Sequence, residues 1–455
     1  MHVSLLAKPL WQRSPFRAFA LSAILVFSVA ALIIWRLQSA EVNRIKTLYA
    51  QEKAAIRADG LPLTPDQVVP NHTPEVQNAA PLYLSIFTAF KAHPQWRILE
   101  ANALSVFANF PPNAKTLRAA DRYVQATRPE MAKVEKAVRL PYCDFHYDWS
   151  VRPLSSYTNY ANFRTLARLI ALDAVRLDRE GKPMAALDRL AVGARMVQQF
   201  TSADPSVMAL LVSSAMNTIF GKAWTLIVQH HPHDLVVLRH AQKVNHLLVR
   251  SYDLRWFLRY EVYETVWLGD YLRQHPKEAL KLLQEAGGFN APPPQEVWWK
   301  KLWRRFTGQS GPIPSKFSPL QIDLLEARAL AYYDTAYRTL NSHQANVLAA
   351  QQALQELDGR ADALGHSDPR EYMLLNARVP LSYILQHLLQ TESRWWQREL
   401  LAEQYIYRCE HGHAPADVRR LPAVQQMPES IRWIFFLPKS SSPTNRPAPH
   451  TFFRP

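Results

Sequence analysis

The chain has little glycine and almost no cysteine, with 12 and 2 among its 455 residues. Sheet-rich and nucleotide-binding folds use glycine in tight turns and phosphate loops, so its scarcity favours helices. The two cysteines, Cys143 and Cys409, are too few for a disulfide-rich scaffold. They would be able to pair with each other in an oxidising compartment. Hydrophobic residues make up 48% of the chain, which excludes disorder along its whole length.

Recognisable catalytic and cofactor motifs are also lacking. The sequence has no GxSxG, HExxH, P-loop or GxGxxG pattern, and no paired ExxH motifs of the kind that hold two irons in a bundle. A nucleic-acid-binding module is missing too, although the formal charge of +15 would suit one. The sequence therefore predicts no cofactor, no metal and no nucleic-acid partner, and it favours a protein that is not an enzyme.

What the sequence does contain is a long apolar run near its N-terminus. Ala18–Trp35 carries no charged residue, is preceded by Lys8, Arg13 and Arg17, and is followed at once by Arg36. A bilayer core of about 30 Å needs about 20 apolar helical residues, so this run is just long enough to span it. We expect an uncleaved membrane anchor.

A cleaved signal peptide is the alternative for this run. Its apolar region would normally be shorter and would end at a small-x-small cleavage site. Here, cleavage after Ala40 would place Gln38, which is not a small residue, at the −3 position. Basic residues are nearly balanced on the two sides, so they do not fix the orientation. Because a short N-terminal flank usually stays inside, we expect a single-pass inner-membrane protein with its body on the periplasmic side.

The rest of the chain predicts an all-α body of irregular, partly tetratricopeptide-like helical hairpins. Its clearest unit is Tyr160–Phe200, where two apolar stripes at helical spacing flank a turn with Gly181 and Pro183. No second copy recurs at a fixed period of about 34 residues, so a regular solenoid is not predicted.

A second apolar run, Ser206–Val228, contains Asn217 and Lys222 and is predicted to be a buried core helix. The predicted organisation has seven parts: a basic flank (1–17), the anchor (18–35), a helical stalk and Pro-rich linker (36–80), a first helical half (81–286), an aromatic and basic Pro-rich interruption (287–320), a second helical half (321–426) and a Pro-rich, disordered tail (427–455). Helices are expected near 81–93, 96–109, 113–139, 157–180, 184–200, 205–230, 234–274, 277–286, 320–340, 343–358, 370–390 and 392–411.

Three stretches carry a resemblance to known proteins. They are NAAPLYLSIFTAF at 78–90, the hairpin at 166–216, and ESRWWQRELLAEQYIYRCEHGHAPADVRRL at 392–421. In the third, a long helix leads to Tyr-Arg-x-x-His-Gly, then to proline and a short helix. Here the chain resembles a group of uncharacterised bacterial envelope proteins that have one N-terminal anchor and a helical body. The resemblance implies that architecture and location, and no activity, cofactor or catalytic residue.

The segment VWWKKLWRRF at 297–306 has the composition of a peptide that lies in a membrane interface. On a helix its aromatic residues share a face opposed by four cations, which suits an anionic lipid surface. The alternative is that the tryptophans cap the core while the cations face water. The membrane-interface candidates are Trp298, Trp299, Lys300, Lys301, Leu302, Trp303, Arg304, Arg305 and Phe306.

Acid–base chemistry has one weak candidate pair, Glu261 and Glu264. At i and i+3 on one helix they would be close enough for one pKa to be raised. Arg255 and Arg259 nearby favour structural ion pairing instead.

Two histidine-rich stretches have the residue types of metal sites but not their arrangement. The first holds His230, His231, His233 and His240, and Pro232 with Asp234 marks a break between helices there. The second holds Cys409, His411 and His413. Gly412 is expected at the left-handed position that ends a helix, and His411 would interact favourably with the helix dipole.

Together these patterns predict a membrane-anchored helical scaffold or binding protein of the cell envelope. Its expected partners are the lipid bilayer through the N-terminal helix, an anionic lipid surface, and envelope proteins. The alternative is an enzyme that acts on an envelope lipid or polymer and uses the helix of Glu261 and Glu264.

Overall fold

The computed structural model describes residues 14–64, 67–68, 74–107, 113–147, 159–248, 252–275, 319–343, 346–367 and 380–436. Every regular element in these ranges is a helix, which confirms the predicted all-α class. The chain forms two compact units, described separately below. The first comprises the described residues of Met1–Gly60 and Leu268–Ala331, and the second those of Leu61–Trp267 and Tyr332–Pro455.

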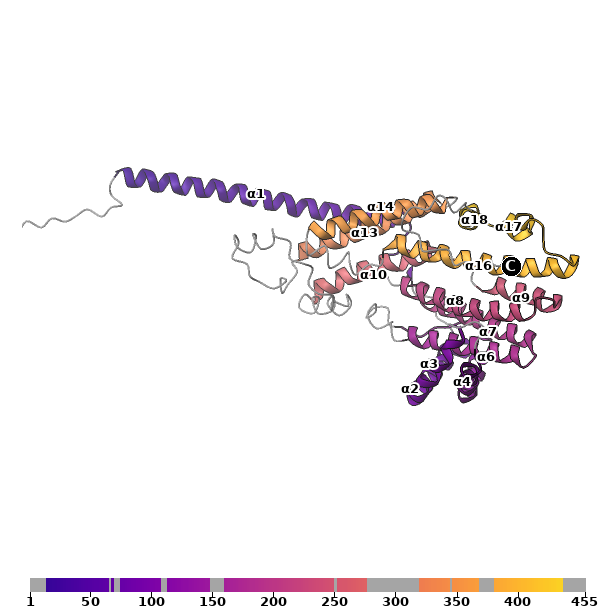
Figure 1. Ribbon diagram of the computed structural model, residues 1–455. Helices are drawn as coiled ribbons and strands as arrows, with labels where there is room; N and C mark the ends of the chain where they lie inside the picture. Colours follow the sequence, from indigo (N-terminus) through magenta and orange to yellow (C-terminus); the bar gives the residue numbers. More distant parts are fainter. Residues whose placement is uncertain are drawn as a thin grey trace, which may run out of the picture. The chain divides into compact units, whose positions relative to one another are not determined.

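The first unit is built on α1 (Ser14–Ala58), which joins the predicted anchor and stalk in one unbroken helix (Figure 1). The end of α10 (Leu254–Gln274) and the start of α13 (Pro319–Ser342) complete this unit. The C-terminal half of α1 buries Ile45 and Ile56, which are 4% and 0% exposed. This half therefore packs as an ordinary amphipathic helix.

A buried carboxylate ties these three helices together. Glu326 of α13 accepts a hydrogen bond from the Tyr49 hydroxyl of α1 at 2.9 Å and pairs with Arg273 of α10. Lys53 lies 3.6 Å from the same carboxylate. Burial raises the pKa of Glu326 although Arg273 and Lys53 oppose the shift. The C-terminal half of α1 is thus fixed by charge-assisted hydrogen bonds within its own unit.

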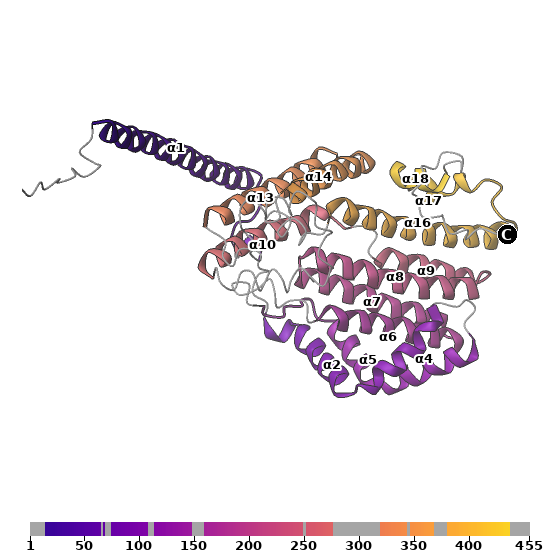
Figure 2. The same cartoon turned by 60° about the vertical axis from the view of Figure 1, so that its left-hand side comes forward.

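The second unit holds the remaining helices. The α6–α7 hairpin lies at its centre: α8 packs on both helices, α9 packs on α7, and α16 packs on α8 and α9 (Figure 2). The elements are η3 (Glu75–Gln77), α2 (Ala80–Ala92), α3 (Gln95–Ala103), η4 (Leu104–Phe107), α4 (Ala114–Ala126), α5 (Arg128–Ala137), α6 (Tyr160–Arg179), α7 (Pro183–Ala203), α8 (Val207–His230), α9 (Leu235–Leu247), α14 (Val347–Ser367), α16 (Leu381–His411), η6 (Val418–Arg420), α17 (Pro422–Gln426) and α18 (Glu429–Phe436).

The predicted hairpin is confirmed in detail. Gly181 has φ +74°, and the amides of Gly181 and Lys182 donate to the carbonyls of Asp178 and Leu177 at 3.0 Å each. This turn satisfies carbonyls that the end of α6 leaves without partners, and Pro183 opens α7. The predicted apolar stripes are buried except at Leu177, which is partly exposed; Leu166, Leu169, Leu187 and Leu190 are fully buried.

Four predicted boundaries are wrong. The segment 113–139 is two helices, α4 and α5, which meet at Thr127. Tertiary packing accounts for the other three. The segment 234–274 is two helices, because the backbone is extended at Leu248, a residue that is itself buried in the core. The segments near 370–390 and 392–411 meet inside one helix, α16, which begins at Leu381. Part of the predicted disordered tail is helical: α18 buries Ile431 and contacts α16.

Candidate functional site

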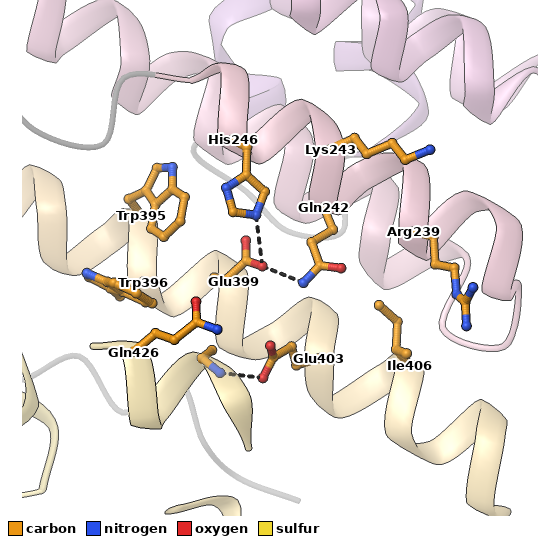
Figure 3. Close-up of a pocket in the computed structure, with 11 residues that line it drawn as sticks. Arg239, Gln242, Lys243, His246, Trp395, Trp396, Glu399, Glu403, Ile406 and Gln426 are labelled. Atoms are coloured by element: carbon orange, nitrogen blue, oxygen red, sulfur yellow. Dashed lines mark hydrogen bonds and ion pairs between the residues drawn. The ribbon is translucent and has the colours of Figure 1, made fainter. Parts of the chain in front are cut away.

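The candidate site is a groove between α9, α16 and α17, with a volume of about 690 Å³. This volume is within the usual range for ligand sites, about 300–1,000 Å³. Side chains of both charges line the groove beside two tryptophans of α16 (Figure 3). The lining residues are Arg239, Gln242, Lys243, His246, Trp395, Trp396, Glu399, Glu403, Ile406, Ala423 and Gln426.

The α9 wall of the groove follows from an amphipathic pattern. Asp234 caps the helix by accepting hydrogen bonds from the amides of Val236 and Val237 at 3.0 and 3.1 Å, which confirms the predicted cap. One face of α9 is buried in the core through Val237, Leu238, Ala241 and Val244. The basic side chains Arg239, Lys243 and His246 recur at i, i+4 and i+7, so they share the other face.

The floor of the groove is a hydrogen-bond network centred on Asn245, which is fully buried. Its side-chain amide donates to Glu399 at 2.9 Å, and its carbonyl oxygens accept from Trp395 Nε1 at 2.8 Å and Arg398 Nε at 2.7 Å. Glu399 also accepts from Gln242, and His246 Nε2 lies 3.4 Å from it (Figure 3). A fully partnered network of this kind fixes α9 against α16.

Arg398 lies beneath this floor, against α8. A Cβ atom at Gly221 would come within 2.4 Å of the guanidinium, so glycine is needed at that point of α8. Burial lowers the pKa of Arg398 to about 10, and repulsion from Arg394 adds to the shift.

Glu403 links the groove to α17. Its Oε2 accepts a hydrogen bond from the Ala423 amide at 2.8 Å, at the start of that short helix. Burial, followed by the charge of Glu399, raises the pKa of the Glu403 carboxyl. Since Glu403 lines the groove, a carboxyl that holds its proton more readily than usual faces the cavity.

The cations on the rim differ in their partners. Arg239 forms an exposed ion pair with Glu410 at 2.8 Å. Lys243 makes no ion pair with any residue that the structure describes. Its three N–H donors are therefore available to a ligand.

The predicted acid pair lies elsewhere. Glu261 accepts a hydrogen bond from the Val207 amide at 3.0 Å, at the start of α8. Burial raises its pKa to about 7, and the charge of Asp204 acts in the same direction. Glu264 lies half-buried one turn further along α10. Neither glutamate lines the groove, and Glu261 is positioned as a partner for a helix N-terminus.

Three of the four histidines around the α8–α9 turn contact carboxylates. His230 and His231 share Asp178 at 2.6 and 2.8 Å, and His240 pairs with Asp188 at 2.8 Å. Within the described part of the chain, no group of three or more His, Cys, Asp or Glu side chains is arranged to hold a metal ion.

The Cys409–His413 stretch is a helix end, as predicted. Gly412 has φ +76°, and its amide donates to the Arg408 carbonyl at 2.9 Å. The pairing of Cys143 with Cys409, which the sequence left open, is not formed in this structure, where both are free thiols. Cys143 is buried, which raises its pKa strongly, whereas Cys409 lies near the Pro232 carbonyl at the end of α8.

The predicted membrane elements have different outcomes. The interface candidates Trp298–Phe306 lie outside the described residues. Among the described residues, α8 is the helix that is long and apolar enough to cross a membrane. However, 67% of its apolar window is buried inside the protein. The apolar side chains described near the start of α1 are instead exposed: Leu25, Val26, Val29, Leu32, Ile33, Ile34, Trp35 and Leu37 are each 48–66% accessible.

The groove was not predicted from the sequence. The one available signal was the basic i, i+4, i+7 pattern of Arg239, Lys243 and His246, and it resembles any solvated helix face. Comparison with known proteins finds no matching family model, no matching curated protein and no matching solved structure. The functional conclusion therefore depends on the residues and geometry of this chain.

Proposed function

We propose that this protein is a membrane-anchored helical scaffold or binding protein of the cell envelope, in which the start of α1 spans the inner membrane. The exposed apolar surface of α1 carries the proposal. Leu32–Trp35 are consecutive and all exposed, and four residues exceed one helical turn, so apolar side chains face every direction. A helix that is apolar all round belongs in a protein core or a bilayer.

The energetics favour the bilayer. Transferring one large apolar side chain from water to an apolar environment gains about 1.5–3 kcal/mol. The exposed apolar residues of α1 would together gain on the order of 10 kcal/mol or more. The charge-free run Ala18–Trp35 rises about 27 Å as a helix, which is close to the thickness of the hydrocarbon core.

The polar end of α1 supports the scaffold part of the proposal. Tyr49 and Lys53 are bound to Glu326, so the helix leaving the membrane is held by α10 and α13. The body would then carry the contacts of a binding protein, with the groove of α9, α16 and α17 as one contact site. The segment Trp298–Phe306 remains our proposed contact with an anionic lipid surface.

An enzyme that acts on an envelope lipid or polymer is the alternative proposal. It receives little support from Glu261, which caps α8 and does not line the groove.

The anchor is tested by membrane fractionation. We expect the full chain to stay with membranes after extraction at high pH, and a variant with Leu25, Val29, Leu32 and Ile33 changed to Gln to be released. A matched control changes four exposed apolar residues of the body to Gln, namely Val76, Ile98, Val236 and Leu348. If the control is released and the α1 variant is retained, α1 is not the anchor.

The orientation has a separate test. A reporter that is active only in the periplasm, fused after residue 430, should be active if the body is translocated. An inactive reporter beside an active cytoplasmic one would place the body on the other side.

A further inference from the structure

The groove has hydrogen-bonding groups that the fold does not use. Lys243 has no ion-pair partner, and the Gln426 side chain makes no hydrogen bond, among the described residues. Glu403 uses Oε2 for Ala423, which leaves Oε1 for a ligand. Donors and acceptors are thus both available along one cavity.

These groups are spread along a line. Arg239 and His246 are seven residues apart on α9, which corresponds to about 10 Å along the helix. At about 3.3 Å per residue, an extended peptide of about three residues covers that length. Its backbone presents alternating N–H and C=O groups, which match a wall that holds both amides and a carboxyl group.

The charge pattern selects an acidic peptide over a compact anion. The cations lie in a row and do not converge, while Glu399 and Glu403 line the same cavity. A phosphate group bound there would be close to both carboxyl groups and would be repelled by them. A peptide can direct an acidic side chain to Lys243 while its amide donates to Glu403.

We infer that the groove of α9, α16 and α17 binds a short, extended, acidic peptide segment of a partner protein, with Lys243 as its main charge contact. This inference deepens the binding role proposed above, but it does not depend on α1 being the anchor.

The test uses the full chain in non-ionic detergent, so a failure of the anchor does not affect it. The probe is a fluorescein-labelled hexapeptide pool with Asp or Glu at its two central positions, compared with a pool that has Asn or Gln there. We expect saturable binding of the acidic pool in fluorescence anisotropy, and about tenfold weaker binding of the amide pool.

Lys243→Glu should weaken binding of the acidic pool about tenfold, because it reverses the main charge contact. Lys115→Glu is the matched control: it makes the same change of net charge at an exposed position of α4 and should have no effect. Lys243 is exposed, so its substitution should leave the helical circular dichroism unchanged.

Four results would overturn the inference. The two pools could bind equally or not at all, or Lys243→Glu could behave like Lys115→Glu. Displacement of the acidic pool by inorganic phosphate as effectively as by unlabelled peptide would instead show a phosphate site. Each result leaves the fractionation test of α1 unaffected.

Discussion

Two apolar helices of this protein have opposite surroundings. One is α8, which among the described residues is the helix long and apolar enough to cross a membrane; the other is the start of α1, the anchor predicted from the sequence. The described apolar side chains at the start of α1 are exposed, with Leu37 at 66% and Trp35 at 60%. In α8, by contrast, Phe220, Trp224 and Ile227 are fully buried inside the second unit. Hydropathy alone therefore does not distinguish a helix that packs in the core from a helix whose apolar side chains are exposed.

The polar residues of α8 account for the difference. Ser214 lies 3.0 Å from His387 Nε2 and 2.6 Å from Thr391 Oγ1, both on α16. One turn further along, the Thr218 hydroxyl accepts from Arg394 at 3.1 Å, and Gly221 makes room for Arg398. Ser214, Thr218 and Gly221 form a polar seam along which α8 packs on α16 of the same chain. The described part of the α1 run has no comparable seam.

The largest expected effect is on the free energy of unfolding, and it should differ between Trp224 and Trp35. Trp224→Ala should lower the free energy of unfolding by about 3–5 kcal/mol, because it removes a buried ring and the hydrogen bond from Nε1 to the Ala241 carbonyl. Trp35→Ala should change it by less than about 0.5 kcal/mol, because that side chain is exposed. Denaturant unfolding in non-ionic detergent measures both. Equal effects of the two substitutions would contradict the burial of Trp224 in α8 and the exposure of Trp35 in α1.

The start of α8 should make stability depend on pH. The pKa of Glu261 is raised from 4.5 to about 7, so the folded state holds a proton that the unfolded state releases between these values. The stabilisation is present below pH 4.5 and is lost as pH rises to about 7, with a fall on the order of 3 kcal/mol. In Glu261→Gln, which keeps an acceptor for Val207, unfolding midpoints should lose this slope. An unchanged slope would assign it to another group.

The polar seam predicts a smaller effect. Ser214→Val should cost about 1–2 kcal/mol, because His387 and Thr391 lose a buried partner. The same change at Ser28, which is exposed on α1, should not destabilise the body and should strengthen membrane retention. Thermal unfolding and membrane extraction of the two variants provide the comparison; a stabilised Ser214→Val would show that the seam is dispensable.

The smallest expected effect comes from packing of α7 against α8. A Cβ atom at Gly193 would lie 2.6 Å from the Phe220 ring, so Gly193→Ala should cost about 1 kcal/mol despite the better helix propensity of alanine. Gly359 on α14 has no atom within 4 Å of such a Cβ, so Gly359→Ala should stabilise by about 0.5–1 kcal/mol. Effects of the same sign in denaturant unfolding would contradict this account of the packing.

Local signals predicted part of the fold well. Gly181 with Pro183 predicted the turn between α6 and α7, and Gly412 predicted the end of α16, since both depend on backbone conformations that favour glycine. The burial of Ser206–Val228 also followed from its interrupting polar residues. These features are encoded within a few residues of where they occur.

Tertiary features were not predictable in the same way. The break at Leu248 contains no glycine or proline and arises because that side chain is buried. The groove brings Lys243 together with Glu399 and Glu403, which are more than 150 positions away in the sequence. In the sequence, a charged helix face that contacts solvent has the same pattern as one that contacts another helix. Only the packing of α9 on α16 therefore reveals the site.

The distinction between α1 and α8 is tested most directly by the depth of two labels in a bilayer. Single cysteines at Val29 in α1 and Lys222 in α8, in a chain with Cys143 and Cys409 changed to Ser, would carry an environment-sensitive fluorophore in proteoliposomes. We predict that quenchers attached to lipid chains quench the label at 29 and not the label at 222. Quenching at 222 without quenching at 29 would contradict the proposal that α1 is the membrane anchor.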